Sequence, residues 1–364
     1  MIRVGIIGVG NCASMLIQSI VYYKSKGNGY KDGLIVRDIG GYNVSDIEIV
    51  AAFDVAQNKV GKPLYDAILE KPNLVKSFTN PKSNVRVSLG PLLDGVAKHM
   101  YGSVNPISTG KISDVVKVLK DNKVDILINL LPVGSEKATE AYVKAALLAK
   151  CSFINAIPVF IASDEKKGYV RKFKESGLVL LGDDMKGQLG ATSLHRALVA
   201  LFRDRGVTIE NTYQLNVGGN SDFLNMMDQE RLISKKISKT EAITSLLADS
   251  KQIGAKEIHV GPSGYIEFLN NNKIAYVSIH GKGFADLPMQ LEVKLTVDDK
   301  MNSSAVLIDT IRAAKLAMDM GDLGAAYNIS SNYFKHPLVQ ASDESNAKAR
   351  FIEWLKNSKQ GNHT

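Results

Sequence analysis

The sequence predicts an α/β protein built on a doubly wound parallel sheet, followed by a second α+β domain whose sheet is mainly antiparallel. Between residues 2 and 204, short apolar runs alternate with helical patterns, as in parallel sheets covered by crossover helices. Between residues 208 and 297, strand-like runs follow one another with few helices between them, as in antiparallel sheets. The length of 364 residues also exceeds what one simple core requires.

Composition and charge indicate the class of ligand. Hydrophobic residues make up 45% of the chain and charged residues 23%, as in ordinary globular proteins. The formal net charge of +8 favours anionic ligands. Lys and Arg are nevertheless spread along the chain, and only 7% of residues are aromatic, which leaves little surface for base stacking. We therefore expect a phosphorylated small molecule as ligand and no nucleic acid.

The cysteines and the first residues indicate the compartment. Cys12 and Cys151 make neither a disulfide framework nor a metal-type CxxC pair. The chain begins MIRVGIIGVG, without the pattern of a secretory signal, and no apolar run reaches about 18 residues. We therefore expect a cytoplasmic protein that does not contact a membrane.

The first strand and the glycine turn after it predict a Rossmann-like dinucleotide site. Residues 2–7 form a short apolar run, GVGNCA follows at once, and a helical pattern comes next. Gly8 permits the tight turn, Gly10 lets the backbone approach a pyrophosphate, and Ala13 keeps helix and strand close. The residues of this turn that we expect to bind the cofactor are Gly8, Gly10, Asn11, Cys12 and Ala13.

An acidic residue ends the second predicted strand and favours NAD over NADP. A polar insertion (24–46) precedes this strand (47–53), which ends in Asp54. A carboxylate there would accept hydrogen bonds from the adenosine ribose hydroxyls and repel a 2′-phosphate. Asp54 could instead cap the turn that follows, and the sequence leaves this alternative open.

The rest of the first domain alternates regularly after an irregular connection. Residues 60–110 contain several prolines and a brief strand candidate at 85–89, and we expect them on the cofactor side. The elements expected next are helices at 112–120, 135–150 and 165–175 and strands at 124–132, 152–157 and 178–182. Ligands bind beyond the carboxyl ends of such strands. From these strand ends we expect the cofactor to contact Pro132, Val133, Asn155, Pro158 and Asp184.

The pattern changes after a helix at 190–204. The expected strands of the second sheet are 208–217, 257–260, 274–280 and 289–297, followed by helices at 302–320 and 345–356. The predicted division is a dinucleotide-binding domain (1–200), an α+β substrate and oligomerisation domain (201–320) and a C-terminal segment (321–364) that returns to the first domain.

A Gly-Gly-Asn-Ser-Asp turn predicts a helix start suited to an anion. Gly218 and Gly219 allow a tight backbone, and the polar residues 220–222 are strong N-cap residues. If the helix continues, Lys235 and Lys239 lie four residues apart on one face. The alternative is an ordinary capped helix with two solvated lysines.

Several long motifs, in order along nearly the whole chain, carry a resemblance to a known family. They are GVGNCAS, VAAFDV, LPVGSE, NAIPVFIASD, GDDMK, LNVGGNSDFLN, SKKISKT, SSAVLIDTIRAAK and YFKHP. With these motifs the chain resembles inositol-3-phosphate synthase (myo-inositol-1-phosphate synthase) in its shorter bacterial and archaeal forms. The resemblance implies NAD-dependent conversion of glucose 6-phosphate to inositol 3-phosphate, the first step of inositol and inositol-phospholipid synthesis, by a homotetramer. The expected steps are oxidation at C5, enolisation, aldol closure and return of the hydride.

The resemblance also assigns roles to lysines. Lys235 would act on the C5 hydroxyl, Lys273 and Lys335 would lie near the developing oxyanions, and Lys186 would lie against the nicotinamide and substrate. Fixed ammonium groups stabilise an enolate or alkoxide, and a neutral lysine moves protons. Lys239 would hold phosphate or position the sugar. The further residues that the resemblance assigns to the substrate are Thr192, Asn216, Asn220 and Asp222.

Two departures and two alternatives stay open. This chain has Gly187 where the family commonly has Ser, and Asn271 where an acidic residue is frequent. Prokaryotic members often use a divalent cation, and Asp309 is the position we expect for it.

A simple NAD-dependent dehydrogenase would have the same domain plan and accumulate NADH. A non-catalytic NAD-sensing regulator would keep the glycine turn without needing the lysines.

Overall fold

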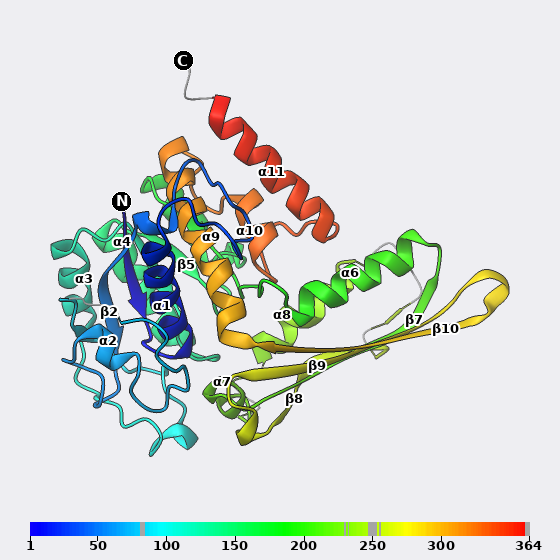
Figure 1. The fold of residues 1–364 in the computed structure, drawn as a ribbon, viewed down its shortest axis with the longest axis horizontal. Helices are drawn as coiled ribbons and strands as arrows, with labels where there is room; N and C mark the ends of the chain where they lie inside the picture. Colours follow the sequence, from blue (N-terminus) through cyan, green and yellow to red (C-terminus); the bar gives the residue numbers. More distant parts are fainter. Residues whose placement is uncertain (81–83, 229–230, 232, 247–252, 255, 361–364) are drawn as a thin grey trace.

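Two sheets organise the molecule (Figure 1). The computed structural model describes the chain except residues 81–83, 229–230, 232, 247–252, 255 and 361–364. The first sheet has the strand order β3-β2-β1-β4-β5-β6, and all of its pairings are parallel. Its strands are β1 (Ile2–Ile7), β2 (Ile47–Asp54), β3 (Val87–Leu89), β4 (Ile126–Asn129), β5 (Ser152–Asn155) and β6 (Leu180–Leu181).

Helices cover both faces of this sheet, as the alternating pattern predicts. One apolar cluster joins the sheet to α1 (Asn11–Lys26) and α9 (Asp299–Met320), and a second joins it to α3 (Ile112–Asp121), α4 (Glu136–Ala149) and α5 (Tyr169–Glu175). Strands buried on both faces read as continuous apolar runs, which explains the sequences of β1 and β4. The doubly wound fold is therefore confirmed.

The second sheet is mixed, with the order β10-β9-β7-β8. Its strands are β7 (Thr208–Gly218), β8 (Ile258–Tyr265), β9 (Asn272–Lys282) and β10 (Pro288–Asp298). The β10–β9 and β9–β7 pairs are antiparallel, as expected, whereas β7 and β8 are parallel. Parallel neighbours need a crossover, and α7 (Ser221–Asn225) and α8 (Ile233–Thr244) lie in that connection.

Two helices cover one face of the second sheet. The apolar side chains of α6 (Ala191–Asp204) and α8 pack with those of β7, β8 and β9. Along β7 buried and more exposed residues alternate, the signature of a sheet with one covered face. The single helix expected after Asp222 was wrong, because α7 ends at Asn225 and α8 starts separately at Ile233.

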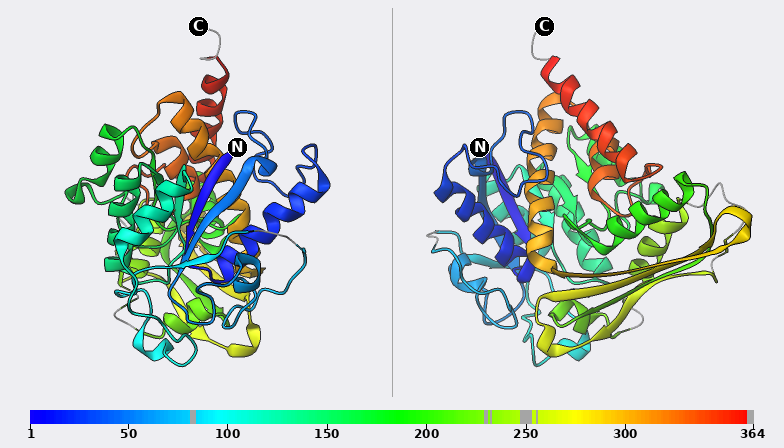
Figure 2. Two further views of the ribbon diagram at one scale, coloured as in Figure 1. Left: turned by 90° about the vertical axis from the view of Figure 1, so that its left-hand side faces the viewer. Right: turned by 45° about the vertical axis from the view of Figure 1, so that its right-hand side comes forward.

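The chain from α9 onward returns to the first sheet. In Figure 2, α9 runs beside the N-terminal strand and helix, and it contacts α1, β1, β4 and β5. The structure thus packs α9 with the first sheet, whereas the sequence division placed it in the second unit. The remaining helices are α2 (Leu64–Ala67), α10 (Tyr327–Tyr333) and α11 (Glu344–Gln360). Within the described ranges, none of the helices has the length and apolar character needed to cross a membrane.

Candidate active site

A cavity of about 290 Å³ lies where the carboxyl ends of the first sheet meet the second sheet. The irregular segment after β2 closes one side of it, as expected for residues 60–110. Most of the predicted site residues line it together. They are Gly8, Gly10, Asn11, Cys12, Asp54, Pro132, Val133, Pro158, Asp184, Lys186, Thr192, Asn216, Asp222, Lys239, Lys273 and Lys335.

Three predicted residues support the cavity from behind instead of lining it. Ala13 packs in the apolar cluster between α1 and β1. The Asn155 amide donates to Asp183 Oδ1 (2.7 Å) and to the Val159 carbonyl (2.6 Å), so it shapes the end of β5. Asn220 Oδ1 accepts from the backbone N–H of Asp222 (3.0 Å) and caps α7. The side chain of Lys235 lies outside the described residues.

The glycine turn has the geometry that a dinucleotide requires. Gly8 has φ +87°, and a Cβ there would lie 2.9 Å from the Leu130 carbonyl oxygen. A Cβ on Gly10 would meet no atom within 4 Å, and Gly10 begins α1 without a side-chain cap. The first N–H groups of α1 are thus left for a ligand at the positive end of the helix dipole. These residues fit the pyrophosphate of NAD.

Asp54 both caps a turn and lines the cavity. Its Oδ1 accepts from the N–H groups of Val55 (2.7 Å) and Ala56 (2.9 Å), so the capping alternative is correct in part. Its Oδ2 accepts from the N–H of Val9 at 2.7 Å and fixes the glycine turn to the end of β2. Lys59, which sequence reasoning missed, donates to the Val9 carbonyl at 2.8 Å, and burial lowers its pKa.

Asp184 organises the cavity wall opposite the glycine turn. Its Oδ1 accepts from Lys335 Nζ and its Oδ2 from the Ser238 hydroxyl, both at 2.7 Å. The backbone N–H of Lys335 also donates to the Asp184 carbonyl at 2.7 Å. The segment after α10 is therefore hydrogen-bonded to the end of β6, which brings residues 151 positions apart into one wall.

Lys186 is a buried lysine in the same wall. Its ammonium donates to Glu344 Oε1 (3.0 Å) and to the Ser331 carbonyl (3.1 Å). Burial lowers the pKa of Lys186 to about 8, although the Glu344 carboxylate acts in the opposite direction. An amine with this pKa exchanges a proton near neutral pH.

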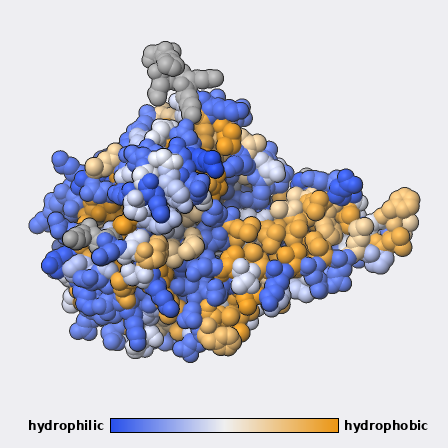
Figure 3. Space-filling view, viewed as in Figure 1, coloured by the Kyte–Doolittle hydropathy of each residue, from blue (hydrophilic) through white to orange (hydrophobic). Residues whose placement is uncertain are grey.

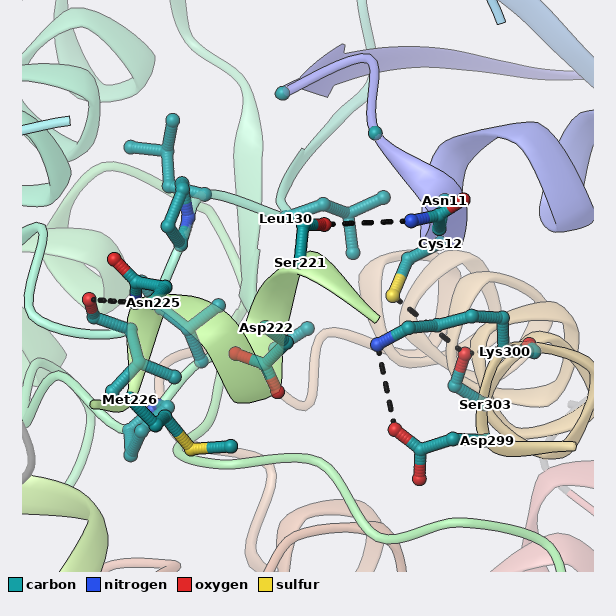
Figure 4. Close-up of a pocket in the computed structure, with 18 of the residues that line it drawn as sticks. Asn11, Cys12, Leu130, Ser221, Asp222, Asn225, Met226, Asp299, Lys300 and Ser303 are labelled. Atoms are coloured by element: carbon teal, nitrogen blue, oxygen red, sulfur yellow. Dashed lines mark hydrogen bonds and ion pairs between the residues drawn. The ribbon is translucent and has the colours of Figure 1, made fainter. Parts of the chain in front are cut away.

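The start of α9 contributes a cation that the sequence did not reveal (Figure 4). Lys300 is buried in the cavity wall, with Nζ 3.4 Å from Asp299 Oδ2, while Asp299 Oδ1 accepts from Lys273 Nζ at 2.6 Å. Burial alone would lower the pKa of Lys300, but Cys12, Asp299 and Asp222 raise it overall. Lys300 thus stays an ammonium. The sequence predicted that this helix starts at residue 302, which placed Lys300 in a loop. Its place in the cavity wall could therefore not be predicted.

Polar side chains also contribute to the cavity lining. Gln214 and Asn225 both line the cavity, and Asn225 Oδ1 has no hydrogen-bond partner among the described residues. Asn11 Nδ2 donates to the Ser221 hydroxyl at 3.5 Å, which joins the starts of α1 and α7 (Figure 4).

Two departures from the family pattern have different surroundings. Gly187 lines the cavity, and a Cβ there would lie 2.8 Å from Asn302 Nδ2. Asn302 is itself held by the Leu189 backbone, so little room exists for the commoner Ser. Asn271 is buried outside the cavity lining, and its Oδ1 has no partner in the described part of the chain.

Asp309, the residue expected to bind a metal, lies outside the cavity lining. Its carboxylate accepts from the Arg312 guanidinium, the Tyr333 hydroxyl (3.0 Å) and the Val36 N–H (3.0 Å). A carboxylate enclosed by three donors has no free oxygen for a cation. The described ranges contain no group of three or more His, Cys, Asp or Glu side chains that could hold one. Asp309 therefore forms a buried ion pair with Arg312 in place of the expected metal site.

Comparison with known proteins identifies the family. A family model described as Myo-inositol-1-phosphate synthase matches residues 190–300. An inositol-3-phosphate synthase of Mycolicibacterium smegmatis is 46% identical over 347 residues, which cover 94% of this chain and 95% of that protein. The chain belongs to the inositol-3-phosphate synthase family. Another inositol-3-phosphate synthase, from Mycobacterium tuberculosis, is 46% identical over 97% of this chain and 95% of its own length.

Solved structures share the fold. The crystal structure of Ari2 superposes with a TM-score of 0.77 at 30% identity and covers 98% of this chain and 99% of its own. A myo-inositol-1-phosphate synthase-related protein from Thermotoga maritima has a TM-score of 0.80 at 24% identity, with 98% of each chain covered. The segment matched to the inositol-3-phosphate synthase family spans α6, the second sheet and the start of α9, so it contains Thr192, Lys239 and Lys273.

Proposed function

We propose that this chain is an NAD-dependent isomerase that converts D-glucose 6-phosphate to 1D-myo-inositol 3-phosphate, the first step of inositol and inositol-phospholipid synthesis. The observation that carries the proposal is the convergence of four lysines on a cavity that also contains a dinucleotide turn. These are the lysines expected from the sequence, Lys186, Lys239, Lys273 and Lys335, and Lys59 and Lys300 line the cavity as well. A dehydrogenase that only transfers hydride has no need of so many ammonium groups.

The cofactor would lie along the glycine turn. The start of α1 and Gly10 would hold the pyrophosphate, and Asp54 would face the adenosine ribose, which favours NAD. Bound NAD would supply a hydride acceptor for C5 of the sugar and return the hydride after ring closure. Pro132, Val133 and Pro158 line the cavity beyond the ends of β4 and β5 and would exclude water from that exchange.

The lysines would carry the proton and charge steps. Removal of a C6 proton from the C5 ketone leaves an enolate, and attack on the C1 aldehyde leaves an alkoxide. The Lys335 and Lys273 ammonium groups, fixed by Asp184 and Asp299, would stabilise these oxygens. Lys186, with a pKa of about 8, would exchange the proton.

The sugar phosphate would be held on the side of the second sheet. Lys239 and Thr192 line the cavity there and are largely buried. Asn216 donates to the Gly261 carbonyl at 2.8 Å and accepts from Gln214 at 3.0 Å, so its orientation is fixed before a ligand binds. Preorganised polar groups reduce the entropy lost on binding.

We also propose that copies of the chain assemble through the second sheet, as in the homotetramer that the family resemblance suggests. β10 is an edge strand whose apolar residues are only partly covered. Large apolar side chains at Leu287 and Met289 are 63% and 49% exposed. Figure 3 shows an apolar area over this part of the molecule. Such a surface on an edge strand favours a protein partner.

One incubation tests the proposed function. The protein is given glucose 6-phosphate and NAD, with and without chelator, and the product is measured as phosphate released after periodate oxidation. Inositol phosphate without accumulated NADH is the expected result. Stoichiometric NADH would instead indicate a dehydrogenase. Binding of NAD without conversion of the sugar would favour a regulator, and loss of product with chelator would restore a metal requirement.

A further inference from the structure

The geometry points to Glu344, the first residue of α11, as a positioning residue that holds Lys186 in the active site and makes the C-terminal helix part of the catalytic machinery. This inference rests on the proposed function, in which Lys186 exchanges a proton with the sugar. Glu344 itself does not line the cavity. It acts through the lysine.

The contacts of Glu344 connect two helices, α6 and α11, with the segment that follows β6. Its Oε1 accepts from Lys186 Nζ at 3.0 Å and from Arg196 Nε at 2.7 Å, and its Oε2 accepts from Lys186 Nζ at 3.2 Å. Arg196 lies in α6 and Lys186 follows β6, so the start of α11 is held between them. The side chains of Lys186 and Arg196 are 5% and 1% exposed and that of Glu344 is 24% exposed, so the two cations are shielded from solvent and the carboxylate is partly accessible.

The two cations depend on Glu344 to different degrees. Arg196 also donates to the Ala242 carbonyl, the Ser245 hydroxyl (3.1 Å) and the Ala341 carbonyl (3.2 Å). It remains well hydrogen-bonded without the carboxylate. For Lys186, the described contacts beside Glu344 give one further acceptor, the Ser331 carbonyl. Removing the carboxylate therefore affects Lys186 more than Arg196.

The charged groups that face Lys186 come from three segments. Glu344 of α11 favours the protonated lysine, whereas Arg196 of α6 and Lys335, after α10, oppose it. Desolvation is the largest cause of the lowered pKa, and Glu344 is the largest charge acting against it. Without Glu344, two cations and burial would all lower the pKa of Lys186 further. The protonated fraction at neutral pH would fall.

Substitution of Glu344→Gln tests this role, because it keeps the size of the side chain and removes the charge. The limb of the kcat profile that Lys186 governs should move to lower pH by about one unit, since an opposite charge within hydrogen-bond distance shifts a pKa by that order. The direction is the same whether the lysine acts as acid or base. Glu344→Asp should restore part of the shift. Affinity for NAD should stay within about twofold, because Glu344 contacts no residue of the glycine turn.

A matched control and a second readout separate this role from a structural one. Glu353→Gln makes the same change at an exposed position of α11 and should leave the profile unchanged. The pH dependence of Lys186 acetylation by acetic anhydride, followed by peptide mass spectrometry, reports the proton affinity without turnover. Its midpoint should fall in Glu344→Gln alone. Equal midpoints in the wild type and Glu344→Gln would overturn the inference, whereas a protein that makes no inositol phosphate but shows the shifted midpoint would overturn only the proposed function.

Discussion

At the scale of single residues, Gly8 and Gly10 are glycines for different reasons. Gly8 needs a left-handed backbone (φ +87°), and a Cβ there would contact the Leu130 carbonyl. Gly10 has open space where its Cβ would lie. We expect Gly8→Ala to cost about 1 to 3 kcal/mol of stability, and Gly10→Ala to keep stability while weakening NAD binding at least tenfold, or about 1.4 kcal/mol. Urea unfolding and calorimetric titration with NAD measure the two effects.

The comparison of Gly8→Ala with Gly10→Ala separates an effect on stability from an effect on NAD binding. A stable Gly10→Ala protein with wild-type NAD affinity would show that the cofactor does not approach the start of α1. Equal loss of stability in both variants would show that the open space beside Gly10 is filled in solution.

Asp309 provides a second prediction at this scale. Asp309→Asn leaves the buried guanidinium of Arg312 without its carboxylate, and breaking a buried pair on one side costs about 3 kcal/mol. We expect lower resistance to urea, with the KM values and the response to chelator of the folded enzyme unchanged. If the variant loses a metal dependence that the wild type has, Asp309 binds the cation after all.

Residue-level prediction worked where chemistry is local and failed where it depends on packing. GVGNCA and Asp54 could be placed from adjacent letters, because a glycine turn and the strand end beside it are short-range features. Lys300 and Lys59 could not be distinguished from the other basic residues, because their burial depends on where α9 starts and how the chain folds back after β2. The other lysines of the cavity were predicted from the long motifs in which they lie, because a lysine taken singly carries no such signal.

At the scale of elements, the short helix α7 positions Ser221 and Asp222 at the cavity. Asn220 Oδ1 holds its first N–H groups, at 3.0 Å from Asp222 N and 3.3 Å from Phe223 N. We expect Asn220→Ala to cost about 1 kcal/mol of stability and to raise the KM for the sugar phosphate. Asn220→Ser keeps a capping oxygen and should restore both values, measured by urea unfolding and initial rates.

The serine variant is the decisive one. If it regains stability but keeps the raised KM, the Asn220 amide contacts the substrate directly, as the family resemblance implies. Asn220 Nδ2 has no partner within the described ranges, but it is buried outside the cavity lining, so that outcome would show that the amide becomes accessible when the substrate binds.

Element prediction succeeded for the regular alternation and failed at the break between α7 and α8. The strands of the first sheet follow from continuous apolar runs, and its helices follow from a period of 3.6 residues. The residues between Asn225 and Ile233 include no glycine or proline that would mark a helix end. The sequence therefore predicted one continuous helix. Lys239 nonetheless reaches the cavity, because α8 is placed by its packing against β8 and α6.

At the scale of the whole molecule, the cavity is built from distant parts of the chain. The glycine turn, the end of β6, the second sheet and the segment after α10 all reach it. The sequence division into three units did not foresee that α9 packs on α1 or that Glu344 pairs with Lys186. Such contacts leave no periodic signal, because the partner of each buried side chain lies far away in the sequence.

A row of partly exposed apolar side chains on β10, which includes Leu291 and Val293, gives a prediction about assembly. In the register of β10 and β9, Leu291 lies opposite Ile279 and Val293 opposite Val277. The β9 partners are buried under helices, whereas Leu291 and Val293 remain partly exposed at the edge of the sheet. A second copy that covered this row would remove apolar surface from water, at roughly 25 cal/mol per Å². A lysine within the row would oppose that burial, because its charge would be desolvated.

Under the proposed assembly, we expect Leu291→Lys to have a smaller mass than the wild type in light scattering coupled to size-exclusion chromatography. Glu292→Lys alters the charge by more but points to the opposite face of the strand, so it should leave the mass unchanged. Because successive side chains of a strand point to opposite faces, the two substitutions test different surfaces of the sheet. If Glu292→Lys dissociates the assembly and Leu291→Lys does not, copies meet through the polar face, and the exposed row on β10 serves some other contact.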